Sequence, residues 1–308
     1  MDISKAMQVV ERTMYDVLDS DVTTLREASR HILEAGGKRV RPRLVLLSYA
    51  ATGGTNIDTI APVAAAVELV HTASVVHDDI NDHGSIRRGR PSVNAIWGRT
   101  FALLTGDYLF TKVYELMAPY KDMNIILAEA TIALVEGETL QAAAAKEGDL
   151  SREVYFQIIA RKTAALFKSG AHLGAELANA TREQIDALAH YGYNVGLAFQ
   201  IIDDILDLIA DDDQLGKSAG MDLAQGKGYA SVHAERNGKT VVADQIALAD
   251  DPLARIKQKI LEGNAIEEGR QQATMLVQQA IQSLDVLPDS EAKEGLIELA
   301  ELIIERDH

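Results

Sequence analysis

The sequence contains no cysteine, so it can form no disulfide, no cysteine metal site and no thiol nucleophile. Only 6 of its 308 residues are proline and 5% are aromatic, whereas alanine, leucine, isoleucine and glutamate are abundant. No run of alternating polarity suggests a series of strands. This composition favours an all-helical fold, and the lack of cysteine fits an intracellular protein, which we expect to be cytoplasmic.

Long apolar runs are also scarce. The first residues, Met1–Lys5, lack the apolar core of a signal peptide. The longest uncharged run, near Ala187–Ile202, is shorter than the ~20 residues that a membrane-spanning helix needs, and it contains polar side chains such as His190. We therefore expect no transmembrane segment and at most peripheral contact with a membrane.

Basic residues are in deficit, with 30 lysines and arginines against 46 acidic residues and a net charge of −16. A nucleic-acid role would need a strong basic face, which this balance disfavours. The basic residues that do cluster are typical of phosphate clamps inside an acidic protein. They are Lys38, Arg39, Arg41 and Arg43 in one segment, and Arg87, Arg88 and Arg90 in another.

No low-complexity linker or fixed-period repeat divides the chain, so we expect one domain over residues 1–308. Periodicity and breaker residues predict one or two helices over 5–36 that end at Gly36-Gly37. A functional loop is expected over Asp211–Gly228, followed by two or three more helices, the last from about Ser290. The intervening helices are predicted over Pro42–Ala51, from about Ile60 to just before Gly84, and over Ser92–Met117, Asn124–Ala145, Ser151–Ala180 and Thr181–Leu208.

Two aspartate clusters of the same form are the most informative feature: Asp78-Asp79-Ile80-Asn81-Asp82 and Asp203-Asp204-Ile205-Leu206-Asp207. Each follows a mainly apolar run, and residues four apart share one face of a helix. One such cluster alone is more typical of a helix end or a solvated acidic face. Two opposed clusters would form a carboxylate-lined opening, whose negative charge must be neutralised by cations. Carboxylate oxygens are ligands that suit magnesium. The pair predicts metal-bridged diphosphate chemistry.

Cationic and polar residues flank both clusters. Lys38 and Arg41 lie at a predicted helix start after two glycines, where they can bind an anion. The alternative is a basic helix boundary that binds no ligand. Arg87 and Arg88 can bind phosphate oxygens bidentately or lie in a surface turn. His71 lies two helical turns before the first cluster, and by itself such a histidine is more often a core residue. The other candidates near the clusters are Gln200, Lys217 and Lys227.

Together these segments resemble the trans-prenyl diphosphate synthase (polyprenyl synthetase) family over essentially the whole chain, and most closely its members that make geranylgeranyl or longer products. The order and spacing of the matching segments make the resemblance specific. They are Gly36–Pro42, Leu69–Asp82, Arg87–Pro91, Gly137-Glu138 with Gln141, Lys162–Ala164 and Phe199–Asp207.

The resemblance implies the isoprenoid synthase fold, in which helices surround a central active-site cavity, and a homodimer. It also implies that isopentenyl diphosphate condenses with an allylic diphosphate, through ionisation, condensation and elimination that depend on magnesium, with three ions present when substrate is bound. Asp78, Asp82 and Asp203 would bind the ions, supported by Asp79, Asp204 and Asp207. Arg87, Lys162, Thr163, Gln200, Lys217 and Lys227 would hold the allylic diphosphate, and Lys38, Arg41, His71 and Arg88 would hold isopentenyl diphosphate. Of these, Asp78, Asp82, Arg87, Lys162, Asp203 and Lys217 are the expected catalytic residues.

Two positions bear on product length. In short-chain members of the family a bulky aromatic residue lies four or five residues before the first aspartate and closes the product tunnel, whereas this chain has Ala73 and Ser74 there. We expect a product longer than fifteen carbons, of twenty to thirty-five; ordinary packing of small residues is the other explanation. One departure from the family concerns Gly226-Lys227, which is followed by Gly228-Tyr229-Ala230 and makes the role of Lys227 less certain.

Four other functions stay open. A farnesyl diphosphate synthase would use the same residues and stop at fifteen carbons. A terpene cyclase would not need Lys38, Arg41, His71 and Arg88. A metal-dependent phosphohydrolase could use His77-Asp78 but lacks other well-spaced histidines, and a non-catalytic subunit would not need two complete aspartate clusters.

Overall fold

The structure is a computed structural model that describes residues 1–147, 151–209 and 264–306. The predicted loop over Asp211–Gly228, with Lys217 and Lys227, lies outside the described residues. The elements are α1 (Ile3–Val17), α2 (Thr23–Glu34), α3 (Val40–Ala51), α4 (Ile57–Asn81), β1 (Ile86–Arg87), β2 (Arg90–Pro91), α5 (Val93–Trp97), α6 (Arg99–Met117), the 3-10 turn η1 (Ala118–Tyr120), α7 (Met123–Glu147), α8 (Arg152–Ile159), the π-helical turn η2 (Ala160–Ala164), α9 (Ala165–Leu177), α10 (Arg182–Ile209), α15 (Ala265–Ser283), the 3-10 turn η4 (Leu284–Val286) and α16 (Glu291–Ile304).

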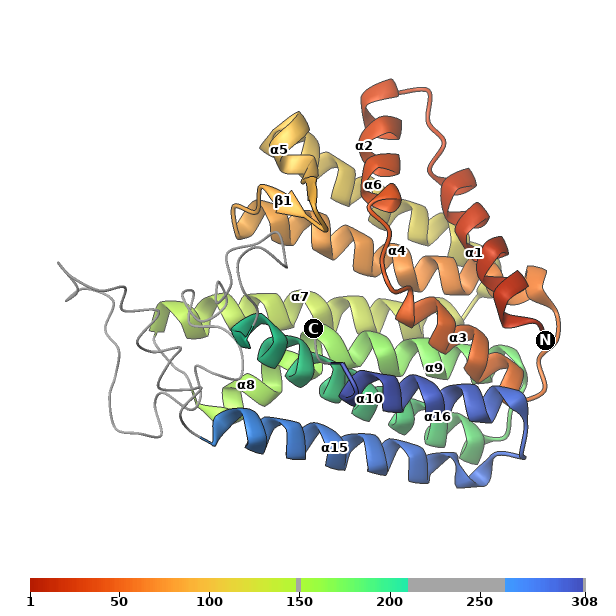
Figure 1. Cartoon of the computed structure of the whole chain (residues 1–308). Coiled ribbons are helices and arrows are strands. Elements are labelled where there is room, and N and C mark those ends of the chain that lie inside the picture. The colour runs from red at the N-terminus through yellow and green to blue at the C-terminus, as the bar shows by residue number, and fades with distance from the viewer. Residues whose placement is uncertain (148–150, 210–263, 307–308) are drawn as a thin grey trace.

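The predicted all-helical fold is confirmed in the described part of the chain. Long helices run side by side, and the C-terminal ends of α4 and α10 lie at the same end of the molecule (Figure 1). The helices pack into two hydrophobic cores, one around α4 and one around α10. α3 and α9 contribute to both, because opposite faces of each helix are buried: Val45 and Leu166 belong to the first core, Leu44 and Phe167 to the second.

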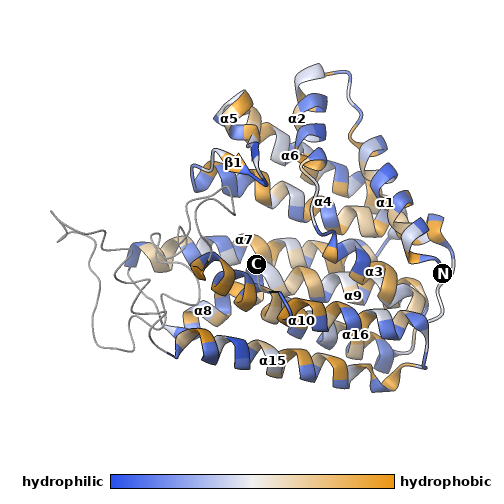
Figure 2. Ribbon diagram, viewed as in Figure 1, coloured by the Kyte–Doolittle hydropathy of each residue, from blue (hydrophilic) through white to orange (hydrophobic). Residues whose placement is uncertain are grey.

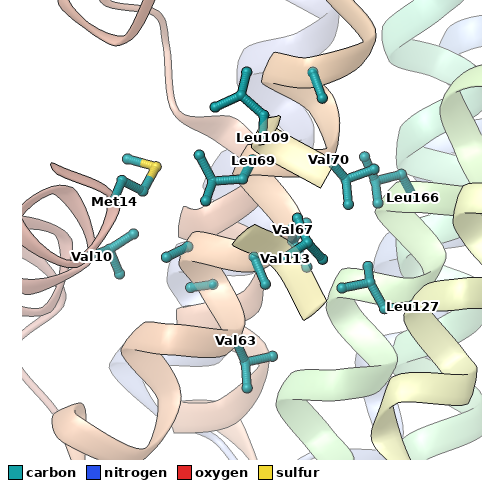
Figure 3. Packing of buried hydrophobic residues seen from close by; sticks show 14 of the residues in the cluster. Val10, Met14, Val63, Val67, Leu69, Val70, Leu109, Val113, Leu127 and Leu166 are labelled. Atoms are coloured by element: carbon teal, nitrogen blue, oxygen red, sulfur yellow. The ribbon is translucent and has the colours of Figure 1, made fainter. Parts of the chain in front are cut away.

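α4 is the central helix of the first core. Its valines and leucines contact side chains from four other helices (Figure 3), and each such side chain contributes about 1.5–3 kcal/mol when fully buried. Because α4 is surrounded in this way, its C-terminal end is held rigidly in place. The labelled contacts are Val10 and Met14 of α1, Val63, Val67, Leu69 and Val70 of α4, Leu109 and Val113 of α6, Leu127 of α7 and Leu166 of α9.

α4 is also the one helix in the described residues that is long and apolar enough to cross a membrane. Its most apolar window is 78% buried inside the protein, which is expected of a core helix. The hydropathy colouring shows apolar and polar residues interleaved along most other helices (Figure 2), as amphipathic packing requires.

Local sequence explains many helix boundaries. Asn56 and Ser92 cap α4 and α5 by accepting hydrogen bonds from backbone N–H groups three residues later, and Ser151 and Ser290 do the same for α8 and α16. Such caps satisfy donors that the first helical turn leaves free. The predicted start of the last helix near Ser290 is therefore confirmed with its physical cause.

Two predicted continuous helices are interrupted. The helix expected over Ser92–Met117 is divided into α5 and α6 at Gly98, whose φ of 81° a residue with a side chain rarely adopts. The helix expected over Ser151–Ala180 contains the π-helical turn η2 between α8 and α9. No glycine or proline marks η2, so its sequence carries no breaker signal.

The segment after the first aspartate cluster forms a short hairpin, although we expected no strands. β1 and β2 pair antiparallel, with Arg87 opposite Arg90. Arg88 and Gly89, at the turn, have φ values of 52° and 72°, as a two-residue turn with two left-handed positions requires. The hairpin sets the direction of Arg88, which the sequence did not reveal.

Candidate active site

The first aspartate cluster lies at the C-terminal end of α4. Asp82 follows the last helical residue, and its N–H donates to the carbonyl of Asp78, so the two residues lie one helical turn apart. Burial raises the pKa of Asp78 to about 6, and the charges of Glu138 and Asp82 act in the same direction. A helix C-terminus also carries partial negative charge. These carboxylates therefore form an electronegative site that a cation would stabilise.

Asp79, in the same cluster, is buried and paired with an arginine. Its side chain is 2% exposed and accepts a hydrogen bond of 2.9 Å from Nε of Arg87, together with a second from Nη2. Arg87 belongs to β1, so this buried ion pair fastens the hairpin to α4. Asp79 is placed to support the site by fixing Arg87.

The second aspartate cluster lies near the C-terminal end of α10, and its three carboxylates have different surroundings. The side chain of Asp203 is 50% exposed, with Nη2 of Arg306 at 3.4 Å, and Asp207 is partly buried. Asp204 is buried, and its carboxylate accepts hydrogen bonds from the Tyr155 hydroxyl at 2.6 Å and from Nε2 of Gln200 at 2.8 Å. Asp203 and Asp207 are thus the more accessible carboxylates.

The π-helical turn η2 connects the two clusters. Lys162 extends its Nζ to Glu138 at 2.5 Å, to Gln141 at 3.2 Å and towards Asp78 at 3.8 Å. Burial opposes its charge, yet the carboxylates of Asp78 and Glu138 together raise the pKa of Lys162 above its ordinary value. On the other side of η2, the Thr163 hydroxyl donates to Oε1 of Gln200 at 2.7 Å.

Close packing of α7 makes this arrangement possible. A Cβ on Gly137 would lie 2.8 Å from the backbone nitrogen of Lys162, so only glycine allows α7 to approach η2 this closely. π-helical turns are rare and often occur at functional sites. The turn presents Lys162 to the first cluster and Thr163 to the second.

A cationic cluster, formed by Lys38, Arg41, His71 and Arg88, lies near the start of α3, where the charge of Asp203 acts on both Arg41 and Lys38. Arg41 is partly buried as a residue, and the removal of its guanidinium from water lowers its pKa to about 10 although Glu68 and Asp203 favour its charge. Its guanidinium lies 4.8 Å from the centre of the Phe167 ring, and its Nε has no hydrogen-bond partner among the described residues. Burial of a charged donor in this way is costly unless an anion completes its hydrogen bonds.

The other members of the cationic cluster differ in exposure, since Lys38 and Arg88 are exposed and His71 is partly buried. Burial and the neighbouring Arg41 and Arg88 hold the pKa of His71 well below its usual range, so the ring is neutral near pH 7. The guanidinium of Arg88 lies against Gly37, where a Cβ would come within 2.5 Å of Nη1. Burial and the charge of Arg306 lower the pKa of Lys38. The cluster is suited to bind an anion by charge and by a neutral hydrogen-bonding imidazole.

The carboxylates fit a hard divalent cation by their chemistry, since they are clustered oxygen donors. Within the described ranges, however, no group of three or more Asp, Glu or His side chains is close enough to hold a metal by itself. Ions at this site would therefore share their coordination with oxygens of a ligand, as magnesium commonly does with phosphates.

Three comparisons with known proteins identify the family. The sequence pattern described as polyprenyl synthetase matches residues 22–262. The chain belongs to this family. It is 37% identical to the short chain isoprenyl diphosphate synthase of Methanothermobacter thermautotrophicus over 97% of this chain and 95% of that one. It is also 34% identical to octaprenyl diphosphate synthase of Escherichia coli, over 98% and 96% respectively.

Solved structures agree with the sequence comparisons. The polyprenyl synthase of Caulobacter crescentus, complexed with calcium and isoprenyl diphosphate, has a TM-score of 0.92 and 34% identity, covering 99% of this chain and 96% of that one. Geranylgeranyl pyrophosphate synthetase of Pyrococcus horikoshii has a TM-score of 0.87 at 34% identity, covering 99% and 97%. The fold is that of the isoprenoid synthases, and the chain is a prenyl diphosphate synthase, an enzyme of isoprenoid biosynthesis.

Some residues at the site were missed in the sequence. Arg306, after α16, lies with its guanidinium 5.0 Å from the Phe199 ring centre and close to Asp203, yet a lone arginine near the end of a chain carries no signal. Tyr155 and Glu68 lie in helices, outside the motifs that the sequence analysis identified. Glu138 and Gln141 were part of the resemblance but had no role until the structure placed them on Lys162.

We expect Tyr155→Phe to weaken the second cluster. The change removes the 2.6 Å hydrogen bond to Asp204, and losing a bond to a buried carboxylate costs about 1–3 kcal/mol. The magnesium concentration for half-maximal activity should rise several-fold, measured by titrating the ion in a condensation assay. Tyr193→Phe, on α10 and partly exposed, serves as the control. An unchanged magnesium dependence would show that this hydrogen bond does not orient Asp204 for metal binding.

Proposed function

We propose that residues 1–308 work as one domain, in the cytoplasm, to condense isopentenyl diphosphate with an allylic diphosphate. The observation that carries the proposal is the presence of two kinds of charged site. Asp78 and Asp203 belong to carboxylate clusters at the ends of α4 and α10, whereas Arg41 and Arg88 belong to a cationic cluster. A cyclase or a phosphohydrolase needs only the first kind, so the second supports a two-substrate condensation.

The carboxylate site suits the allylic diphosphate. Asp78, Asp82 and Asp203, with Asp207, would hold magnesium ions, three with substrate bound, which neutralise the diphosphate and favour its departure. Lys162 and Thr163, presented by η2, would contact its oxygens together with Gln200. Arg87, fixed by Asp79, is placed to act with them, and Lys217 and Lys227 are proposed for the same role. Fixed cations stabilise the charge that develops on the leaving group.

The cationic cluster suits the diphosphate of the second substrate. Lys38, Arg41 and Arg88 supply charge, and the neutral His71 supplies a hydrogen bond. When the C–O bond of the allylic diphosphate breaks, the double bond of isopentenyl diphosphate attacks the allylic cation and a new C–C bond forms. Loss of a proton, which the released diphosphate can accept, then restores a double bond. Apolar surroundings protect the cation from water.

We further propose that the enzyme is a homodimer. Large apolar side chains that are exposed in the single chain concentrate on two consecutive helices, namely Phe101, Leu103, Leu104 and Tyr114 on α6 and Ile125, Ile132 and Val135 on α7. An apolar surface of this kind is unusual on a monomer and fits a self-complementary contact with a second copy. A relative from Geobacillus stearothermophilus that is 36% identical is named heptaprenyl diphosphate synthase component 2, so a different partner chain is the competing possibility.

Activity of the purified chain alone tests the main proposal. With magnesium, labelled isopentenyl diphosphate and farnesyl diphosphate, we expect prenyl diphosphates longer than fifteen carbons by mass spectrometry. Asp78→Asn should lower kcat at least about a hundredfold, because a metal ligand is lost. Release of phosphate without longer products would favour a phosphohydrolase, a cyclic hydrocarbon would favour a cyclase, and inactivity of the chain by itself would favour a partner-dependent subunit.

Product length should depend on α4. Ser74, which is 8% exposed, lies one turn before Asp78 on the same face, and Ala73 is fully buried in the first core. We expect both Ser74→Phe and Ala73→Phe to shorten products made from a farnesyl primer, and Ala73→Phe also to lower the melting temperature because overpacking costs about 1–3 kcal/mol. Ser74→Ala, which adds no bulk, is the control. A folded variant with unchanged product length would show that its residue does not line the growing chain.

Assembly should depend on the apolar side chains of α7. We expect the wild-type chain to be a dimer by light scattering coupled to size-exclusion chromatography. Ile132→Asp should produce monomers, because Ile132 is 58% exposed in the single chain and a charge would be buried in the contact. Met275→Asp, at the similarly exposed Met275 of α15, should leave the dimer intact. A dimer that persists in Ile132→Asp would exclude this surface.

A further inference from the structure

A buried ion pair lies behind the cationic cluster. Glu68, in the middle of α4, is only 3% exposed, and its Oε1 accepts a 2.9 Å hydrogen bond from Nη1 of Arg39. The same guanidinium donates through Nη2 to the carbonyl oxygen of Leu33, at 3.0 Å. Arg39 therefore ties the end of α2 to the interior of α4 at the place where α3 begins.

Arg39 also holds an unusual backbone conformation. Its φ and ψ are 48° and 38°, the left-handed region, and it directly precedes α3 without a side-chain cap of its own. Gly36 and Gly37, just before it, have positive φ values as well. A left-handed non-glycine residue costs about 1–2 kcal/mol unless its surroundings hold it. Here the two hydrogen bonds of the Arg39 side chain hold the residue in this conformation.

The direction of two members of the cationic cluster follows from this backbone. Lys38 precedes Arg39, and Arg41 lies in the first turn of the helix that starts after it. If the left-handed turn at Arg39 relaxed, Lys38 and the first turn of α3 would change direction relative to α4. Gly37, which supports the guanidinium of Arg88, would move with them.

Glu68 acts on the cluster through charge as well. It favours the charged form of Arg41 and of Arg88, opposing the effect of their burial on the pKa. Glu68 thus pairs with Arg39 and also acts through its charge on Arg41 and Arg88. The excess of positive charge remains available to an anion, while Glu68 limits repulsion among the arginines before the anion binds.

We propose that Glu68 is a positioning residue for the diphosphate of isopentenyl diphosphate, which acts through Arg39 to hold Lys38, Arg41 and Arg88 in a binding arrangement. This inference rests on the proposed function of the cationic cluster. Glu68 does not touch the substrate; it determines where the residues that do so point.

The sign of the effect distinguishes positioning from charge. A carboxylate near an anion site repels the anion, so its removal would by charge alone tighten binding of the diphosphate. If Glu68 positions the cations, its removal weakens binding instead. A merely structural role would lower the amount or stability of folded enzyme and leave both Michaelis constants unchanged.

The experiment measures separate Michaelis constants for the two substrates in Glu68→Gln. We expect KM for isopentenyl diphosphate to rise about ten- to hundredfold, as expected when a charged hydrogen bond is lost, while KM for the allylic diphosphate changes less than about twofold. Glu11→Gln is the matched control, because Glu11 also lies near Arg39, with 3.9 Å between Oε1 and Nε, but is 52% exposed. It should leave both constants unchanged. Calorimetric titration with isopentenyl diphosphate alone should show the same loss of affinity.

Arg39→Lys keeps the test decisive if Glu68→Gln does not fold. A lysine retains the charge but cannot bridge Glu68 and the Leu33 carbonyl with a planar fork, so KM for isopentenyl diphosphate should again rise several-fold. An unchanged or lower constant in a folded variant overturns the inference while wild-type condensation leaves the proposed function standing. Absence of condensation by the wild-type enzyme would instead overturn the proposed function, and this inference with it.

Discussion

Like charges held together in partly buried surroundings are the constraint on which the structure depends. Carboxylates gather where α4 and α10 end, and the partial negative charge of each helix terminus adds to their repulsion. Near the start of α3, Arg39 pairs with the buried carboxylate of Glu68, whose charge also acts on Arg41. Protein groups offset part of each collection, since Lys162 lies near Asp78 and Glu68 pairs with Arg39. A ligand of opposite charge would stabilise each collection further, and in the proposed function the first binds cations that carry a diphosphate and the second binds a diphosphate itself.

The rest of the fold holds these charges in place. One face of the last turns of α4 is buried, because Val76 and Ile80 belong to the first core, and this contact holds Asp78 near its repelling neighbours. The π-helical turn brings Lys162 to Asp78 and Thr163 to Gln200, and the hydrogen bonds from Gln200 and Tyr155 then hold Asp204. On the other side of the site, Asp79 fixes Arg87 and Glu68 fixes Arg39. Two of the buried carboxylates thus orient arginines and need not meet a ligand.

Much of the fold was predictable because its signals are local. Apolar periodicity marked the long helices, and caps such as Ser290 and breakers such as Gly36-Gly37 marked several of their ends. The interruptions at Gly98 and at η2 were not predicted. Gly98 is an isolated glycine in an otherwise helical pattern. η2 contains no breaker residue, and it lies where Gly137 of another helix packs closely against it, which is a tertiary contact that the local sequence does not show. The hairpin that directs Arg88 was similarly too short for any strand pattern to appear.

The order of residues along the chain fixes which chemical groups are present: two carboxylate clusters, the arginines and lysines that flank them, and small residues at Ala73 and Ser74. These follow from residue identity and spacing within single helices, where four residues make one turn. The partner of each group depends on how the helices pack. The tertiary structure pairs Asp79 with Arg87, Asp204 with Tyr155, and Glu68 with Arg39, and it brings Arg306 to Asp203. Such pairs join residues far apart in the chain or depend on an irregular turn, so their distances are set by how the helices pack and no local pattern encodes them.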